Sequence, residues 1–104
     1  MMPQVMRLTK EATGKVEQVL SDVVELREDD PARTDAESEA RQIIDDWAQS
    51  VMALGAEVKG LWLVDFDAGD GYYCWKHPEE TLAYFHGYDE GFTGRRPITP
   101  PLLH

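Results

Sequence analysis

The spacing of apolar residues along this sequence changes once, close to Gly60, and that change constrains the fold more than any other feature. In residues 9–55, apolar side chains recur every three or four positions, which is the spacing of amphipathic helices. In residues 60–86, short apolar runs rich in aromatic and β-branched residues alternate with turn residues, a pattern typical of strands. The sequence therefore predicts an α+β fold in which helices come first and a sheet follows.

Two helices of about 20 residues each are expected in the first half of the chain. The first is predicted to begin at Thr9, a candidate N-cap, and to end near Glu28. The second carries Thr34 three residues before Glu37, the spacing of a capping box, and is expected to end at Gly55. The link between them is short and polar, so the pattern predicts a long antiparallel helical hairpin.

The apolar stripes of these two helices are expected first of all to form core. They are nevertheless longer than a small sheet can cover, and pairing two hairpins into a four-helix arrangement would bury the remainder. We therefore expect the chain to self-associate as a homodimer.

Three strands are expected in the second half, at residues 61–66, 72–76 and 81–86. The turns between them are short, which predicts a three-stranded antiparallel β-meander with the helical hairpin packed on one of its faces. Residues 87–104 are rich in glycine and proline and are expected to form a loop and tail, with the Gly-rich loop folded back over the sheet. The whole chain, residues 1–104, is predicted to be one domain.

Charge and composition exclude several classes of function. Ten Lys and Arg residues against twenty Asp and Glu residues give a net charge of −10, which repels phosphate backbones and argues against nucleic-acid binding. A single Cys cannot form an internal disulfide. No apolar stretch approaches the roughly 20 residues of a membrane span, and the start of the chain lacks the apolar core of a signal peptide. We expect a cytoplasmic protein that does not bind membranes.

A long motif in the second half of the chain resembles a known family. It comprises Leu63-Val64-Asp65-Phe66, then Cys74-Trp75-Lys76, then Tyr84-Phe85-His86-x-x-Asp89-x-Gly91-Phe92-x-Gly94-Arg95. This motif is similar to that of an uncharacterised prokaryotic family, domain of unknown function 2203. The chain departs from the family pattern at Phe85, where Trp is usual, and at Pro78, where Gly is usual. The family has no established activity, so the resemblance marks positions and implies no reaction.

The motif contains the candidates for a ligand pocket near the end of the third strand, which are Asp65, Tyr84, His86, Asp89 and Arg95. Asp65 lies in an otherwise apolar strand, and a buried carboxylate needs a partner, for which Arg95, Arg96 and His86 are candidates. Pairing with Arg95 would tie the last loop to the first strand. Because glycine-rich backbone and guanidinium groups can hold an anion, we expect a binding or interaction module with a small anionic ligand or a protein partner.

An enzyme remains the alternative. His86 and Asp89 could bind a divalent metal ion or act as an acid–base pair, although a spacing of three on a loop is permissive. Cys74 would be a nucleophile only with a base such as His86 or His77 in reach, and a buried Cys otherwise behaves as a small apolar side chain. His86 could also serve structure alone, by hydrogen bonds that fix the loop. The sequence does not decide between these alternatives.

Overall fold

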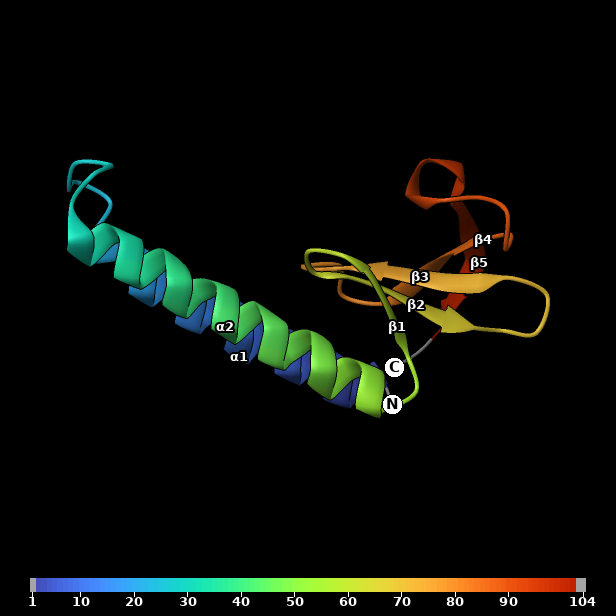
Figure 1. Ribbon diagram of the computed structural model, residues 1–104. Coiled ribbons are helices and arrows are strands. Elements are labelled where there is room, and N and C mark those ends of the chain that lie inside the picture. Colours follow the sequence, from blue (N-terminus) through green and yellow to red (C-terminus); the bar gives the residue numbers. More distant parts are fainter. Residues whose placement is uncertain (1, 103–104) are drawn as a thin grey trace.

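Helices followed by antiparallel strands make up residues 2–102, the part of the chain that the computed structural model describes (Figure 1). In chain order the elements are α1 (Met2–Ser21), α2 (Pro31–Ala53), β1 (Glu57–Gly60), β2 (Leu63–Asp67), β3 (Tyr72–Lys76), β4 (Leu82–His86), the short 3-10 helix η1 (Phe92–Gly94) and β5 (Arg96–Leu102). The predicted α+β class is confirmed. None of the helices in these residues has both the length and the apolar character needed to cross a membrane.

The sheet has five strands, so the prediction of three is wrong. The order is β1-β2-β3-β4-β5 and each neighbouring pair is antiparallel, which extends the predicted meander by one strand at each edge. The two missed strands read EVKG and RPITPPL, and neither shows a continuous apolar run. Edge strands tolerate charge and proline, because one side of their backbone needs no partner. Residues 96–102, expected as loop and tail, therefore form β5, and residues 103–104 of that tail lie outside the described residues.

The first helix begins earlier and ends earlier than the sequence predicted. α1 starts at Met2, so Thr9 lies in its middle and is not an N-cap. The Thr9 side chain is fully buried, and its hydroxyl donates to the carbonyl oxygen of Val5 at 2.8 Å. The same hydroxyl accepts a hydrogen bond from the indole Nε1 of Trp47 at 2.8 Å. A residue type that favours caps is used here as a buried link between the two helices.

The second helix begins with a different cap from the one expected. Asp30 is the N-cap, and its carboxylate accepts from the backbone N–H of Ala32 at 2.9 Å. Pro31 follows in the first turn, where a backbone N–H would have no acceptor within the helix, so proline loses no hydrogen bond there. The predicted capping box at Thr34 and Glu37 is therefore wrong, since both residues lie inside α2. The predicted end of the helix is confirmed, because Gly55 follows the C-cap with a φ of 97°.

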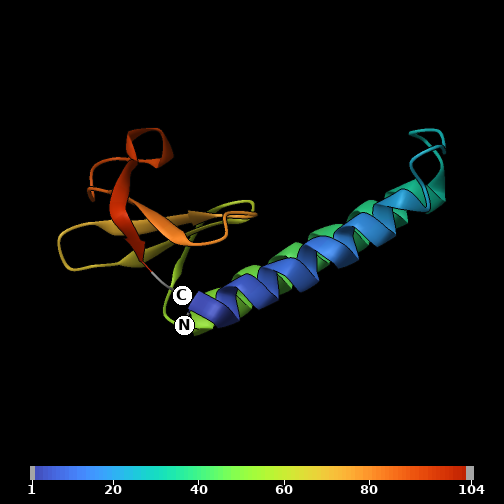
Figure 2. The same ribbon diagram turned by 180° about the vertical axis from the view of Figure 1, so that it is seen from behind.

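The helical hairpin meets the sheet through one end only (Figures 1 and 2). The start of α1 and the end of α2 lie against β1 and β2, while the loop between the helices lies far from the sheet, and the molecule measures 48 Å in its longest direction. The predicted packing of the hairpin against the sheet is therefore confirmed, but this end of the hairpin alone makes the contact. The joint is aromatic: the ring centroids of Trp47 and Trp62 lie 4.8 Å apart at an interplanar angle of 71°. The buried core around it consists of Met2, Val5, Ala12, Trp47, Val51, Ala56, Val64, Trp75 and Leu82.

Candidate functional site

The candidate site lies on the sheet face that points away from this core. Successive side chains of a strand point to opposite faces, so Val64 enters the core and Asp65 points to the other side. The strand register places Cys74 of β3 directly opposite Asp65, and Tyr84 of β4 directly opposite Cys74. His86 ends β4. The segment 87–95, which carries η1, folds back over this face (Figure 1). We call it the covering segment.

A buried histidine and a buried carboxylate form the base of the site. Nε2 of His86 lies 2.9 Å from Oδ2 of Asp65, and both residues are almost fully buried, with exposed fractions of 3% and 2%. Nδ1 of His86 lies 2.9 Å from the carbonyl oxygen of Gly87. Because a carbonyl oxygen can only accept, Nδ1 carries a proton, and the contact with Asp65 then requires one further proton shared between Nε2 and Oδ2. Both ring nitrogens are occupied, so His86 is held as a partner of Asp65 and offers no free base.

The second oxygen of this carboxylate has no partner. Oδ1 of Asp65 is buried and makes no hydrogen bond to any described residue. An unsatisfied buried acceptor of this kind destabilises the folded state by about 1–3 kcal/mol. The neighbouring side chain is the Cys74 thiol, which is a weak donor. One ligand atom each from Asp65, Cys74 and His86 lies within 4.8 Å of the other two.

Cys74 is the only cysteine of the chain, and it is fully buried. Burial raises the pKa of its thiol to about 11, and the negative charge of Asp65 acts in the same direction. The guanidinium of Arg95, 3.9 Å from the sulfur, opposes this increase without cancelling it. A nucleophilic cysteine needs a lowered pKa, so in this environment Cys74 is a protonated thiol at neutral pH.

The guanidinium of Arg95 does not pair with Asp65. It instead forms a two-point contact with the carboxylate of Glu79, with Nη1 3.1 Å from Oε1 and Nη2 bonded to Oε2. Its planar group also lies 3.9 Å from the ring centroid of Tyr84 and 4.3 Å from that of Phe92. The expected Asp65–Arg95 pair is replaced by the Asp65–His86 pair. The guanidinium charge is thus already neutralised and stacked between rings.

Further contacts fasten the covering segment to the sheet. The hydroxyl of Tyr88 donates to Oδ1 of Asp67 at 2.6 Å, which lowers the pKa of Asp67 and raises the pKa of Tyr88 to about 12. Nη1 of Arg96 lies 3.1 Å from Oε1 of Glu90, and the backbone N–H of Gly87 donates to the same oxygen at 2.8 Å. The pKa of Glu90 is lowered by the Gly87 bond and then by Arg96. Arg95 and its neighbour Arg96 therefore both have carboxylate partners.

A cavity of about 340 Å³ lies between the sheet and the covering segment. Its lining residues are Lys59, Leu63, Asp65, Tyr72, Cys74, His86, Tyr88, Glu90, Gly91 and Phe92. Of the five residues proposed from sequence, Asp65 and His86 line this cavity, whereas Tyr84, Asp89 and Arg95 do not. Asp89 is exposed, and the partners of His86 are Asp65 and Gly87. The volume is near the lower end of the 300–1,000 Å³ that is usual for small-molecule sites.

Sequence reasoning missed Cys74, Tyr72 and Lys59 as parts of this site. From sequence, Cys74 is expected to be a small apolar side chain or, with a base in reach, a nucleophile. Its place beside Asp65 follows from the antiparallel register of β2 and β3, which pairs the two residues directly. That register was within reach of the sequence, because the turn between these strands is short. Lys59 lies on β1, a strand that the sequence did not indicate.

Comparison with known proteins gives one match. A family model described as "Uncharacterized conserved protein (DUF2203)" matches residues 1–98, which is nearly the whole chain and confirms the resemblance seen in the motif. No curated protein and no solved structure matches the sequence or the fold.

Proposed function

We propose that this chain, which belongs to the uncharacterized conserved DUF2203 family, is a small ligand-binding module. Its binding site is the cavity between the sheet and the covering segment. One observation carries the proposal: the carboxylate at the base of the cavity, that of Asp65, is buried and has one unpartnered oxygen. A ligand that brings a positive charge or a hydrogen-bond donor would remove the free-energy penalty of that oxygen, so the binding energy would be concentrated there.

The surroundings favour a compact cation or donor over the anion expected from the sequence. An anion would need a positive group to bind, but Arg95 and Arg96 are paired with Glu79 and Glu90. Lys59, which lines the cavity, is paired with Glu57, and its Nζ lies 3.2 Å from Oε1. The cavity itself contains a second carboxylate, Glu90, and several aromatic rings. Aromatic faces attract cations, which adds to the attraction of the carboxylates.

Two probes of the same shape and opposite charge test this proposal. Benzylammonium and benzoate would each be titrated into the metal-free protein, in the presence of a chelator, while backbone amide resonances are followed by NMR. We expect benzylammonium to shift the resonances of Asp65, Cys74 and His86, and Asp65→Asn to weaken its binding at least tenfold. Asp45→Asn, an exposed change on α2 that removes the same charge away from the cavity, is the matched control and should have no effect. Binding of benzoate at these residues in place of benzylammonium would contradict the proposal.

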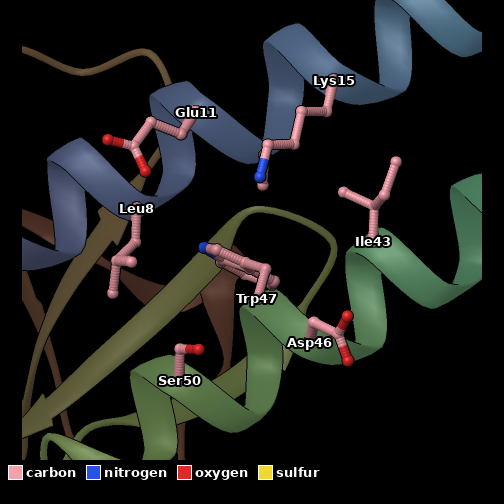
Figure 3. A pocket seen from close by; sticks show the side chains of 8 residues that line it. Leu8, Glu11, Lys15, Ile43, Asp46, Trp47 and Ser50 are labelled. Carbon is pink, nitrogen blue, oxygen red and sulfur yellow. The ribbon is translucent and has the colours of Figure 1, made fainter.

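We propose, as a second function, that the helical hairpin pairs with the hairpin of a second copy of this chain. Two hollows of about 140 and 650 Å³ lie along the seam between α1 and α2, and they share Lys15 and Ile43. Figure 3 shows the smaller of the two. Together they form one groove, which runs from Trp47 near the sheet to Val23 near the hairpin loop. The rest of the lining is Leu8, Glu11, Ala12, Gln18, Val19, Asp22, Ala32, Asp35, Ala36, Glu39, Asp46 and Ser50.

Charge along this groove supports an antiparallel second copy as the occupant. Lys15 lies in its middle, while Asp22, Asp35 and Glu39 line the end near the hairpin loop. An antiparallel partner shifted along the groove, so that the two-fold axis lies between Lys15 and this acidic end, would place its lysine against these carboxylates, and the arrangement would repeat by symmetry. The apolar stretches of both hairpins would then form the interior of a four-helix arrangement.

Sedimentation equilibrium over a range of protein concentrations tests the pairing. We expect a dimer for the native chain and a monomer for Val19→Glu, which places a charge inside the groove. Val24→Glu is the matched control, because Val24 is 66% exposed and does not line the groove. A native chain that is monomeric at every concentration, or two variants that behave alike, would contradict the pairing.

A further inference from the structure

We propose that Asp65, Cys74 and His86 form a binding site for a divalent transition-metal ion, of which Zn²⁺ is the best fit. The inference rests on the proposed function and narrows it, since it names the cation. The three side chains are buried, and each offers one ligand atom, with all three atoms within 4.8 Å of one another. Tetrahedral zinc sites hold their ligand atoms about 3–4 Å apart, so small side-chain rotations would close the site on an ion.

The chemistry of the three donors selects the metal. Thiolate and imidazole ligands favour zinc, cobalt and related ions, whereas magnesium and calcium prefer sites made of oxygen atoms alone. Three protein ligands leave one tetrahedral position unfilled, as in zinc sites that also bind water or substrate. All three ligand residues line the cavity of about 340 Å³, so the fourth position has room for a water molecule or a small ligand.

Two further features of the cluster are those of a metal site. Nδ1 of His86 donates to the carbonyl oxygen of Gly87, which fixes the tautomer that presents Nε2 as a ligand. Histidines that bind metals commonly make this second bond to a carbonyl or carboxylate. Oδ1 of Asp65 has no hydrogen-bond partner, and a cation in the cluster would satisfy it, either by direct ligation or through a bound water molecule.

Replacing two protons by one Zn²⁺ ion leaves the net charge of the buried cluster unchanged. The empty cluster holds one proton shared between His86 and Asp65 and a second proton on the Cys74 sulfur, so its net charge is zero. Binding of Zn²⁺ releases these two protons to solvent and leaves a neutral imidazole, a carboxylate and a thiolate around the ion, which again sum to zero. The buried region therefore accepts the ion without acquiring an unbalanced charge, which would be strongly unfavourable there.

Cobalt(II) is the probe that tests the site, because a thiolate ligand gives it a charge-transfer absorption band and a tetrahedral site gives it visible bands. Cys74 is the only cysteine, so a thiolate band can come from no other residue. We expect the full-length, metal-free chain to develop both bands, to saturate at one cobalt ion per chain, and to lose them when Zn²⁺ is added. A folded protein without a thiolate band at stoichiometric cobalt would overturn the inference. Saturation at half an equivalent would also overturn it, because the site is built from one chain.

Variants show whether the band arises from this cluster. Cys74→Ser should abolish the thiolate band, and Asp65→Asn and His86→Gln should each weaken cobalt binding at least tenfold. The matched control is His77→Gln, which removes a histidine from the turn after β3 and should leave the titration unchanged. Circular dichroism of each variant establishes that it is folded, and equal cobalt binding by the three cluster variants and the control would contradict the site.

The two proposals for this cavity fail in different ways. Binding of benzylammonium without a cobalt band would end the metal inference and leave the ligand-binding module. A protein that binds neither benzylammonium nor cobalt would end both proposals.

Discussion

The helical hairpin and the sheet each bury a polar group, and they treat it differently. In the hairpin, the Thr9 hydroxyl donates to Val5 and accepts from Trp47, so its donor and the indole N–H are both satisfied. On the sheet, the Asp65 carboxylate is equally buried, but only one of its two oxygens has a partner, His86. A buried polar group that makes all its hydrogen bonds stabilises one packing arrangement. A buried polar group that lacks a partner gains free energy when a ligand supplies one.

This difference gives the hydrogen bonds of Thr9 a structural role and leaves the carboxylate of Asp65 available to a ligand. The hydrogen bonds of Thr9 leave no donor or acceptor for a ligand, so we assign them to the packing of α1 against α2. The sheet cluster is held just as firmly but is incomplete. The cation proposal and the zinc inference both depend on this missing hydrogen bond, and substitutions in each region measure how much the buried polar groups contribute.

Trp47→Ala should have the largest effect on stability. Trp47 is 3% exposed and packs against Trp62, and truncation of a buried Trp to Ala typically destabilises a protein by about 3–5 kcal/mol. Urea unfolding measures the loss. The control Met52→Ala, at a position that is 51% exposed on the same helix, should change stability by less than about 0.5 kcal/mol. Similar small losses in both variants would mean that the aromatic joint does not hold the two regions together.

Thr9→Val should have the next largest effect. It keeps the shape of the side chain but leaves the indole N–H of Trp47 buried without an acceptor, which destabilises by about 1–3 kcal/mol. Thr13→Val is the control, since the Thr13 hydroxyl bonds only to the carbonyl of Lys10 on the exposed side of α1. The double variant Thr9→Val/Trp47→Phe, which removes both polar partners, should be more stable than the sum of the two single changes predicts.

Asp65→Asn should change the stability of the metal-free protein by less than about 1 kcal/mol, because the Asn amide N–H can donate to Nε2 of a neutral His86 and so replace the bond to the carboxylate. Urea unfolding in the presence of a chelator measures this effect beside that of Thr9→Val. A loss as large as the Thr9→Val loss would show that the sheet cluster is structural like the hairpin network, and the comparison between the two regions would fail.

The smallest effect concerns the bond that fastens the covering segment to β2. Asp67→Asn should lower the pKa of Tyr88 from about 12 toward its ordinary value of 10.0, because the hydrogen bond to the carboxylate is the main cause of the increase. Since the folded-state pKa is raised, the contribution of this bond to stability is fully present below pH 10.0 and is lost as the pH rises toward 12. The ultraviolet absorbance of tyrosinate during a pH titration measures the shift, and an unchanged titration would contradict the assignment.

The parts of the fold that bury apolar side chains could be predicted from the sequence. Periodicity located both helices and the three central strands, because each carries an apolar face. The edge strands β1 and β5 could not be found this way, since strands at an edge need little apolar burial. The hairpin contacts the sheet where large side chains such as Trp47 lie. The spacing of apolar residues does not show which part of a helix makes such a contact.

The sequence also predicted a part of the site. A carboxylate in an apolar strand, Asp65, required a partner, and His86 was one of the three candidates named. The choice of His86 over Arg95 depends on strand register and on the path of the covering segment, where Glu79 captures the arginine. The unpartnered oxygen is a property of the assembled structure, so no sequence pattern indicates it.

Thermal unfolding with and without Zn²⁺ distinguishes the incomplete cluster on the sheet from the satisfied hydrogen bonds of the hairpin. Native chain, Thr9→Val and Asp65→Asn would each be melted with a chelator and with excess Zn²⁺. Zinc at about 100 times its dissociation constant stabilises a protein by about 2.7 kcal/mol, so the native chain and Thr9→Val should show the same clear increase in Tm. Asp65→Asn should show little or none. No increase in the native chain, or an equal increase in Asp65→Asn, would contradict the claim that the incomplete cluster on the sheet binds Zn²⁺.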